Sequence, residues 1–293
     1  MQAFFNAAKN GDIARLRQFV NNNADLDAEN ENGFTALTLA TREGHADCVQ
    51  LLIDSHANIE TKDSYERTAL VWAGARGHMQ CAQLLITANA DVEVRDRSGD
   101  TALTWAARMG HTACLQLLFE AKADVNARTV SGSSALILAA ANRRTACVQR
   151  LIDLRANVEV RAQNGYTALI WAARMGDKEC VQLLVDANAS LVAADNDGMT
   201  ALMHAVDVGN TAGAERLIDA RADLEAEDGD GKTALLCAAA AGSTECVQLL
   251  LDANASLDVV DDHGNTALML AAGGENWDCV RLLLKILTQF YAM

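Results

Sequence analysis

Seven of the eight cysteines recur at spacings of 33 or 66 residues, and three of them follow a histidine by three residues. The pairs are His45 with Cys48, His78 with Cys81, and His111 with Cys114. Thiolates and imidazoles are zinc ligands, so each H-x-x-C pair supplies half of a tetrahedral site. The other half would have to come from a neighbouring repeat, which lies too far away to close the tetrahedron. We therefore expect no metal ion.

Disulfide bonds are the second chemistry that these cysteines suggest. Neighbouring helical repeats pack about 8–10 Å apart, whereas a disulfide needs α-carbons within about 7 Å of each other. We therefore expect free, buried thiols that pack as small apolar side chains. Free thiols imply a reducing compartment, which makes the protein cytoplasmic or nuclear.

Catalytic motifs are missing from the sequence. It contains no G-x-S-x-G, no phosphate-binding loop and no carboxylate pair that stands apart from the general pattern. Three tryptophans, Trp72, Trp105 and Trp171, share one repeat position, where we interpret the rings mainly as core. We expect neither an enzyme nor a cofactor.

A repeat organises all of these residues. The tripeptide Thr-Ala-Leu, with Ser in one copy, recurs every 33 residues, beginning at Thr35, Thr68, Thr101, Ser134, Thr167, Thr200, Thr233 and Thr266. The predicted domain, 1–293, divides into an N-terminal capping unit 1–30, full units 31–63, 64–96, 97–129, 130–162, 163–195, 196–228 and 229–261, and a C-terminal capping unit 262–293. No residue is left for a linker.

The sequence of each unit predicts two short helices and a turn. In the third full unit, Thr101 is placed to cap a first helix, and Gly110 to end it. Cys114, Leu115 and Leu118 then follow at helical spacing. No unit can bury its own apolar face, so the units must stack. The sequence predicts an all-α solenoid.

The motifs T-A-L-x-x-A, G-H-x-x-C-V-x-L-L and A-D-V-x, repeated in register, make the whole chain resemble ankyrin repeats. The resemblance implies a curved single stack of helix-turn-helix units with β-hairpin loops. The sequence departs from the family pattern Thr-Pro-Leu-His, because its motif has neither the proline nor the histidine. Asparagine replaces the glycine after the second helix at Asn23, Asn89, Asn188 and Asn254.

The resemblance also implies a binding surface, because ankyrin domains usually hold a protein partner on hairpin tips and first-helix ends. The positions that match are Phe34, Arg42, Tyr65, Arg67, Arg76, Arg97, Arg108, Met109, Arg144, Tyr166, Arg174, Met175, Met199 and Asp207. Arginine, tyrosine and methionine suit interfaces, although solvated helix ends have a similar composition. Asn126 matches the residue that asparaginyl hydroxylases modify in this family, and is a candidate acceptor.

The charge is uneven. The 293 residues carry a net charge of −15, which disfavours nucleic acid and anionic membranes as partners. Residues 1–195 hold 19 basic and 23 acidic side chains, and residues 196–293 hold 5 and 16. We expect a protein partner with an acidic-plus-apolar segment on the arginine-rich part, and a protein that is monomeric on its own.

We expect an adaptor or scaffold that binds its partner through the concave groove that the resemblance implies. The alternatives are a structural subunit of a large assembly and an inhibitory or regulatory subunit that occludes a partner's active site. The final segment, LLLKILTQFYAM, extends the last helix, and we expect Ile286, Leu287, Phe290 and Tyr291 to form a docked cap.

Overall fold

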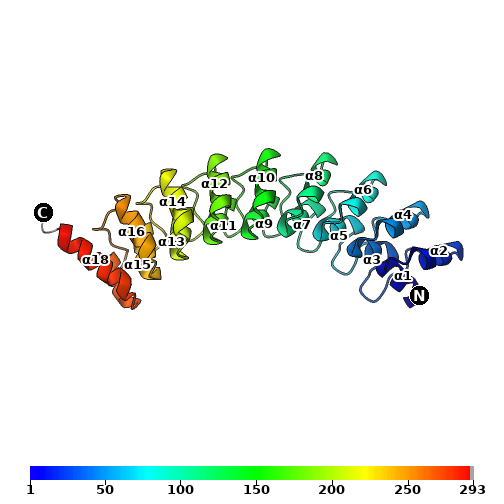
Figure 1. Ribbon diagram of the computed structural model, residues 1–293, viewed down its shortest axis with the longest axis horizontal. Helices are drawn as coiled ribbons and strands as arrows, with labels where there is room; N and C mark the ends of the chain where they lie inside the picture. Colours follow the sequence, from blue (N-terminus) through cyan, green and yellow to red (C-terminus); the bar gives the residue numbers. More distant parts are fainter. Residues whose placement is uncertain (291–293) are drawn as a thin grey trace. The chain divides into compact units, whose positions relative to one another are not determined.

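The chain forms two compact units, Met1–Asn157 (unit 1) and Val158–Met293 (unit 2). The structure, a computed structural model, describes the backbone of residues 1–290 and the side chains of residues 1–288. Within that range every regular element is an α-helix, and the helices form consecutive pairs (Figure 1). The predicted all-α class is confirmed.

Unit 1 contains five helix pairs. They are α1 (Gln2–Lys9) with α2 (Ile13–Asn21), α3 (Ala36–Glu43) with α4 (Ala46–Asp54), α5 (Ala69–Arg76) with α6 (Met79–Thr87), α7 (Ala102–Met109) with α8 (Thr112–Glu120), and α9 (Ala135–Ala141) with α10 (Thr145–Asp153). Each odd-numbered helix packs on the next odd-numbered helix, and each even-numbered helix on the next even-numbered one, so unit 1 has two helical layers.

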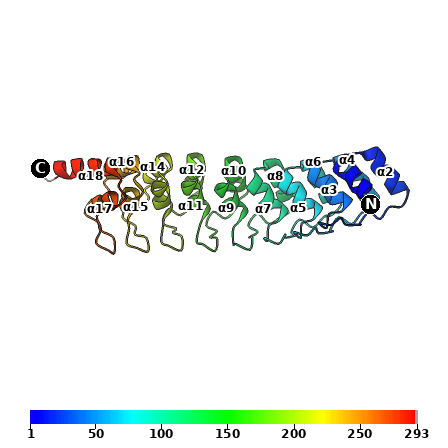
Figure 2. The same cartoon turned by 90° about the horizontal axis from the view of Figure 1, so that it is seen from below.

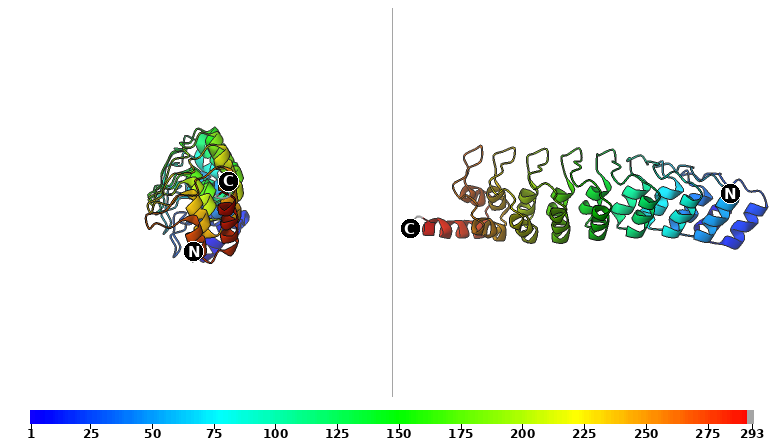
Figure 3. Two further views of the ribbon diagram at one scale, coloured as in Figure 1. Left: turned by 90° about the vertical axis from the view of Figure 1, so that its left-hand side faces the viewer. Right: turned by 90° about the horizontal axis from the view of Figure 1, so that it is seen from above.

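Unit 2 repeats this arrangement in its described residues. Its pairs are α11 (Ala168–Arg174) with α12 (Lys178–Asp186), α13 (Ala201–Asp207) with α14 (Thr211–Asp219), α15 (Ala234–Ala241) with α16 (Thr244–Asp252), and α17 (Ala267–Gly273) with α18 (Trp277–Phe290). The long loops of each unit leave from one side of its layers, next to the odd-numbered helices (Figure 2, Figure 3).

The motif threonine begins the odd-numbered helices as predicted. Thr101 has extended φ and ψ angles, and its hydroxyl accepts the amide N–H of Thr104. Gly110 then ends α7 in the left-handed conformation. The residues that replace glycine after the even-numbered helices adopt positive φ as well, at Asn23, His56, Asn89, Lys122, Arg155, Asn188, Arg221 and Asn254. Asparagine tolerates this conformation best among non-glycine residues.

The core lies between the two layers and between successive pairs. Its repeating members are the alanine and leucine of the motif and a leucine near the middle of each even-numbered helix, such as Leu52, Leu85 and Leu118, each about 0% exposed. All eight cysteines are buried and free. Burial raises the pKa of the Cys81, Cys114 and Cys147 thiols to about 11, so the thiols pack as neutral apolar groups.

The long loops contain tight turns, with two isolated antiparallel bridges and no extended strand in the described residues. An aspartate five residues before the motif threonine organises several of them. In one such turn Asp63 Oδ1 accepts the backbone N–H groups of Tyr65 and Arg67 at 2.8 and 3.0 Å. The same position holds Asp96, Asp195, Asp228 and Asp261 in other loops.

The last helix is longer than the other even-numbered helices, as the sequence predicts. Leu283 and Leu287 of α18 line a small cavity of about 180 Å³ together with Leu257 and Leu268. The part of the expected cap that concerns Tyr291 and the side chain of Phe290 lies outside the described residues.

Candidate functional site

Six of the predicted binding residues gather in unit 1, around two tryptophans. This group, the arginine–aromatic cluster, comprises Phe34, Arg42, Tyr65, Arg67, Trp72, Arg76, Trp105 and Arg108. The residues come from the loops before α3 and α5 and from the helices α3, α5 and α7. Helical side chains lean toward the helix N-terminus, and this directs the arginines at the ends of α3, α5 and α7 back over the aromatic rings.

Arg67 is the centre of the cluster. Its guanidinium carbon lies 4.9 Å from the ring centroid of Trp72 and 4.6 Å from that of Trp105. Its Nε donates to Asp96 Oδ2 at 3.2 Å, a carboxylate whose side chain is 1% exposed. Arg67 therefore fills the space between two successive helix pairs, where Asp96 neutralises its charge.

The tryptophans are fixed by the aspartates that organise the turns. Trp72 Nε1 donates to Asp63 Oδ2 at 2.8 Å, and Trp105 Nε1 donates to Asp96 Oδ2 at 2.9 Å. Trp72 is 9% exposed, so its ring forms the floor of the cluster. Each aspartate thus uses one oxygen for its turn and the other for a side chain nine residues later.

Phe34 and Arg42 form the first layer of the cluster. Phe34 is 7% exposed and lies beneath Arg42, whose guanidinium carbon is 4.8 Å from the ring centroid. Arg42 also donates to Glu43, and these hydrogen bonds lower the pKa of the Glu43 carboxyl. Phe34 therefore supports the surface from below, and Arg42 reaches solvent already paired.

Arg108 is held by a buried carboxylate. Its Nη2 lies 2.8 and 3.1 Å from the two oxygens of Asp100, whose side chain is 1% exposed. Thr104 Oγ1 donates to the same carboxylate at 2.9 Å. Burial nevertheless raises the pKa of Asp100, because the loss of hydration outweighs the effect of Arg108. Arg108 is thus a structural partner of Asp100 as well as a surface residue.

Arg76 differs from the other arginines of the cluster. It is exposed, its guanidinium carbon lies 5.8 Å from the ring centroid of Trp72, and it has no ion pair or hydrogen bond with any residue that the structure describes. The exposed ring of Tyr65, 55% accessible, belongs to the same cluster. Arg76 therefore offers a positioned guanidinium beside apolar surface, with no ion pair to any described residue.

Three further predicted residues of unit 1 lie around the cluster. Arg97 is 64% exposed and approaches Glu66 at only 3.8 Å, and its amide donates to the Tyr65 carbonyl. Met109 is 42% exposed at the end of α7. Arg144 lies in the turn before α10, where its Nε donates to the Arg108 carbonyl at 3.3 Å. Arg144 thus contributes to packing between successive pairs.

Unit 2 contains a second cluster, around Tyr166 and Arg174. The Tyr166 ring lies 4.9 Å from Trp171 and 5.1 Å from His204, and Arg174 donates to the Tyr166 hydroxyl at 3.3 Å. His204 is 1% exposed; its Nε2 is 2.8 Å from Asp195 Oδ2, and its Nδ1 is 3.4 Å from Arg174. These contacts fit a neutral ring with the proton on Nε2.

The remaining predicted residues of unit 2 lie on or near α11 and α13. Met175 is half-buried at the end of α11. Met199 and Asp207 line a pocket of about 550 Å³ next to α15. They are separate in the sequence from Tyr166 and Arg174, and they belong to an acidic part of the surface.

Asn126, the candidate hydroxylation residue, is exposed and makes a contact between loops. Its Oδ1 accepts the backbone N–H of Asn157 at 2.8 Å. Carboxylates make the same contact one repeat away in other loops, as Glu93 does with the N–H of Asp124 at 2.7 Å. The side chain of Asn126 therefore has a structural role whether or not it is modified.

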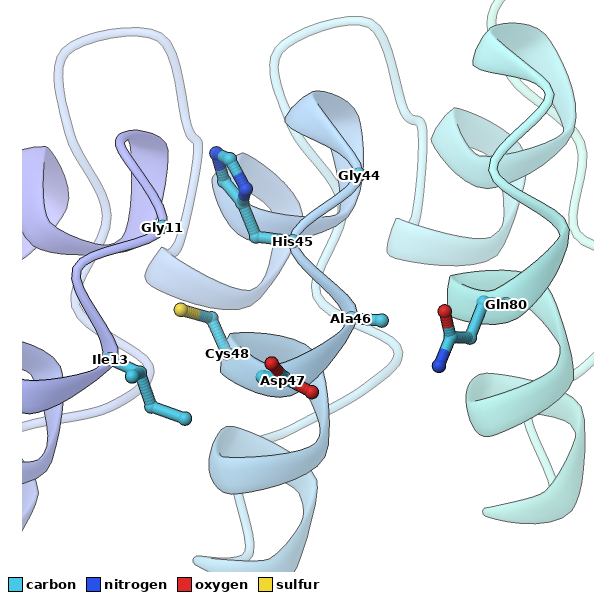
Figure 4. A pocket seen from close by; sticks show the side chains of 8 residues that line it. All are labelled: Gly11, Ile13, Gly44, His45, Ala46, Asp47, Cys48 and Gln80. Atoms are coloured by element: carbon cyan, nitrogen blue, oxygen red, sulfur yellow. The ribbon is translucent and has the colours of Figure 1, made fainter.

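The H-x-x-C pairs lie at the turns between odd- and even-numbered helices. Figure 4 shows His45 directed toward the Gly11 turn, above Cys48, in a pocket of about 290 Å³. His45 Nε2 is 2.9 Å from the Lys9 carbonyl, and a Cβ at Gly11 would lie 2.6 Å from the ring. The histidine thus fills the contact between two successive helix pairs of unit 1. No cluster of three or more potential metal ligands occurs among the described residues.

The sequence alone did not identify the supporting role of the tryptophans. Interpreted mainly as core, Trp72 and Trp105 also carry the arginines on their faces. The signal was the spacing of nine residues between an aspartate and an indole, from Asp63 to Trp72 and from Asp96 to Trp105. Recognising it required knowing that the loop folds back onto its own helix.

The stacked helix pairs, with loops on one side and a short odd-numbered helix in each pair, define a helical repeat protein. Comparison with protein families places the chain more narrowly. A family model described as ankyrin repeats (3 copies) matches residues 4–96, 49–129, 75–162, 136–228 and 209–290. The chain belongs to the ankyrin repeat family, as its motifs predicted, and no curated protein matches it.

Ankyrin repeats generally act as protein–protein interaction modules, and proteins built from them are typically binding scaffolds without catalytic activity. Among the described residues, no helix has both the length and the apolar character needed to cross a membrane.

Proposed function

We propose that the protein is an adaptor or scaffold, not an enzyme, and that it binds a protein partner through the arginine–aromatic cluster of unit 1. The observation that carries this proposal is Arg76, an exposed guanidinium over the Trp72 ring without an ion-pair partner in the described residues. A carboxylate of the partner would form a desolvated ion pair with this guanidinium.

The proposed ligand is a segment with acidic and apolar side chains. Arg76 and Arg97 would bind the acidic groups, since Arg42, Arg67 and Arg108 are paired at 2.8–3.2 Å within the protein, whereas Arg97 has only a long, exposed pair with Glu66 at 3.8 Å. Tyr65 and Met109, 55% and 42% exposed, would contact the apolar side chains. Unit 1 carries 16 basic and 18 acidic side chains and unit 2 carries 8 and 21, so unit 1 is the more favourable unit for an acidic ligand.

Preorganisation supplies the mechanism of binding. The rings of Trp72 and Trp105 are fixed by hydrogen bonds to Asp63 and Asp96, and the arginines rest on those rings. Side chains that are held in place before binding lose less conformational entropy when the partner arrives. A surface of this kind would recognise an extended segment without refolding.

The test uses an affinity capture with mass spectrometry from a native lysate. One bait is Arg76→Glu/Arg97→Glu, which reverses two exposed charges at the cluster. A control bait, Arg15→Glu/Arg150→Glu, makes the same charge change on exposed positions of α2 and α10. Arg108 is left intact because its reversal would place a second carboxylate against Asp100.

The proposal expects a short set of proteins that the wild type and the control capture and the cluster variant loses. Equal capture by all three baits would exclude the cluster as the binding surface. An entire multisubunit particle on every bait would instead favour a structural subunit. Loss of a captured enzyme's activity on addition of the pure protein would favour an inhibitory role.

We also propose a reducing compartment, the cytoplasm or nucleus, as the location of the protein. The support is chemical: eight free thiols occur in one chain, and all are buried. Oxidising compartments favour disulfides in proteins rich in cysteine.

A further inference from the structure

Unit 2 has an acidic pocket at the edge of α13 and α15. Its volume is about 550 Å³, and its lining includes Asp197, Asp207, Asp228 and Asp230 with Met199, Lys232 and Cys237. Lys232 is bound to Asp230 at 3.0 Å. Asp197 and Asp207 form no ion pair with any described residue, so the pocket has an excess of negative charge.

The corresponding space in unit 1 is occupied by a guanidinium of the chain itself. Arg67 lies between Trp72 and Trp105 and bonds to Asp96 Oδ2. Four repeats later, the position of Arg67 is Met199, that of Trp105 is Cys237, and that of Asp96 is Asp228. The carboxylate is retained, whereas the guanidinium and the second indole are replaced by smaller or uncharged groups.

Asp228 also differs from the other aspartates at its repeat position. The second carboxylate oxygen is bound in the four others: by Trp72 at Asp63, by Trp105 and Arg67 at Asp96, by His204 at Asp195, and by Asn265 at Asp261. Asp228 Oδ1 accepts the N–H groups of Asp230 and Lys232, both at 2.9 Å. Its Oδ2 has no hydrogen-bond partner among the described residues.

Cys237 explains why that oxygen is left open. It stands at the position from which Trp72, Trp105 and His204 donate to Asp63, Asp96 and Asp195, and no hydrogen bond joins its thiol to Asp228 in the described residues. The side chain is 6% exposed, lines the pocket, and has no hydrogen-bond partner among the described residues. Burial first, and the nearby Asp228 second, raise its pKa to about 12, so the thiol stays neutral and adds no competing charge.

We propose that this pocket binds an arginine side chain from a basic segment of a protein partner. Asp228 Oδ2 would accept from the guanidinium as Asp96 Oδ2 accepts from Arg67, and Asp207 would contribute a second carboxylate. The planar guanidinium suits a space between two successive helix pairs of unit 2 that Met199 and Cys237 line with sulfur. This binding activity is separate from that proposed for unit 1, because it involves the opposite charge and different residues.

The experiment is a titration of the full chain, labelled with ¹³C at its methionine methyl groups. The probe is the tripeptide Ac-Gly-Arg-Gly-NH₂, and its citrulline and lysine counterparts are the comparisons. Citrulline keeps the shape of arginine without the charge, and lysine keeps the charge without the planar group. The Met199 methyl lies in the pocket, and the Met109 methyl of unit 1 is an internal reference.

The proposal expects a saturable shift of the Met199 signal with the arginine peptide, at least tenfold weaker binding of the citrulline peptide, and weaker binding of the lysine peptide. Asp228→Asn keeps the turn acceptor and should weaken arginine binding at least tenfold. Glu245→Gln, which removes the same charge from exposed α16, should leave it unchanged.

Two further variants test the comparison with unit 1. Met199→Arg supplies an internal guanidinium and should abolish binding, as should Cys237→Trp, which fills the space and can donate to Asp228. Melting curves check that each variant is folded. Equal binding of the arginine and citrulline peptides, full binding by Asp228→Asn, or a shift confined to Met109 would overturn the proposal. Equal binding of the lysine peptide would overturn the assignment to arginine.

Discussion

The ion pair between Arg108 and Asp100 allows a quantitative test of how the binding surface and the fold depend on each other. Arg108→Gln leaves the Asp100 carboxylate, 1% exposed, with the Thr104 hydroxyl as its side-chain donor. A hydrogen bond to a charged group contributes about 1.5–3 kcal/mol, and removing one partner of a fully buried pair costs about 3–5 kcal/mol. Arg108 is 32% exposed, so water compensates in part. We expect a loss of about 2–3 kcal/mol at pH 7.

The other half of the pair behaves differently. Asp100→Asn keeps an acceptor for Thr104 and removes a carboxylate that burial disfavours, so we expect a change within about 1 kcal/mol. In Asp100→Asn/Arg108→Gln the buried charge is gone, and most of the loss should be recovered. The coupling energy should therefore exceed about 1 kcal/mol.

The dependence on pH has a definite sign. The pKa of Asp100 is raised in the folded protein, so protonation of this group adds stability below its unfolded pKa, and the contribution is lost as the pH rises through the folded pKa. Without Arg108 the pKa rises further. The deficit of Arg108→Gln should therefore shrink between pH 7 and about pH 4.

Urea unfolding followed by tryptophan fluorescence measures all four proteins, since the Trp105 ring lies 5.1 Å from the Arg108 guanidinium carbon. Arg150→Gln, on an exposed position of α10, is the control. If Arg108→Gln unfolds within about 0.5 kcal/mol of this control, or if the double variant is no more stable than Arg108→Gln, the argument from burial is wrong.

Three further predictions concern caps, protonation and thiol reactivity. Thr101→Ala removes an acceptor that binds the Thr104 N–H and should cost about 1 kcal/mol in urea unfolding, whereas Thr68→Ala should cost less, because the Thr68 hydroxyl has no hydrogen-bond partner in the part of the chain that the structure describes. A larger loss for Thr68→Ala would contradict the assignment of caps. Burial lowers the pKa of His111, so its neutral form stabilises the fold above about pH 6.5, and this contribution is lost as the pH falls through the folded pKa. His111→Gln should flatten the melting temperature between pH 7 and pH 5, and an unchanged slope would refute the effect. Cys114, with a pKa of about 11, should react with iodoacetamide at pH 8 at least about 100-fold more slowly in the native than in the unfolded protein; mass spectrometry of the labelled peptide measures both rates, and similar rates would show that the thiol is accessible.

The regular features of the fold could be predicted from the sequence because they depend on local chemistry repeated at a fixed spacing. Thr101 caps its helix from a position that the motif fixes, and Asn23 or Asn89 takes the left-handed conformation because the chain must turn there. The buried cysteines followed from the same spacing. Local preference and repeat period together were sufficient for the all-α class and the stacked pairs.

The state of each candidate binding residue could not be predicted in this way. Arg67 and Arg76 are the same residue type, yet Arg67 is paired with Asp96 between two rings, whereas Arg76 has no ion pair within the described side chains, residues 1–288. Phe34 was expected at the surface and is 7% exposed. These differences depend on contacts between successive units, where the loop of one unit meets the helix of the next. A pattern within one unit does not contain that information.

The division of labour within the turn aspartate has an evolutionary consequence. One oxygen accepts the backbone N–H groups of its loop, while the partner of the other oxygen differs between loops: Trp72 for Asp63, His204 for Asp195, and Asn265 for Asp261. A single codon change nine residues after the aspartate can therefore remove the internal donor to the second oxygen and leave a pocket beside it, as the comparison of Trp105 with Cys237 illustrates. New specificity can accumulate by neutral drift along the array while the scaffold that displays it is preserved.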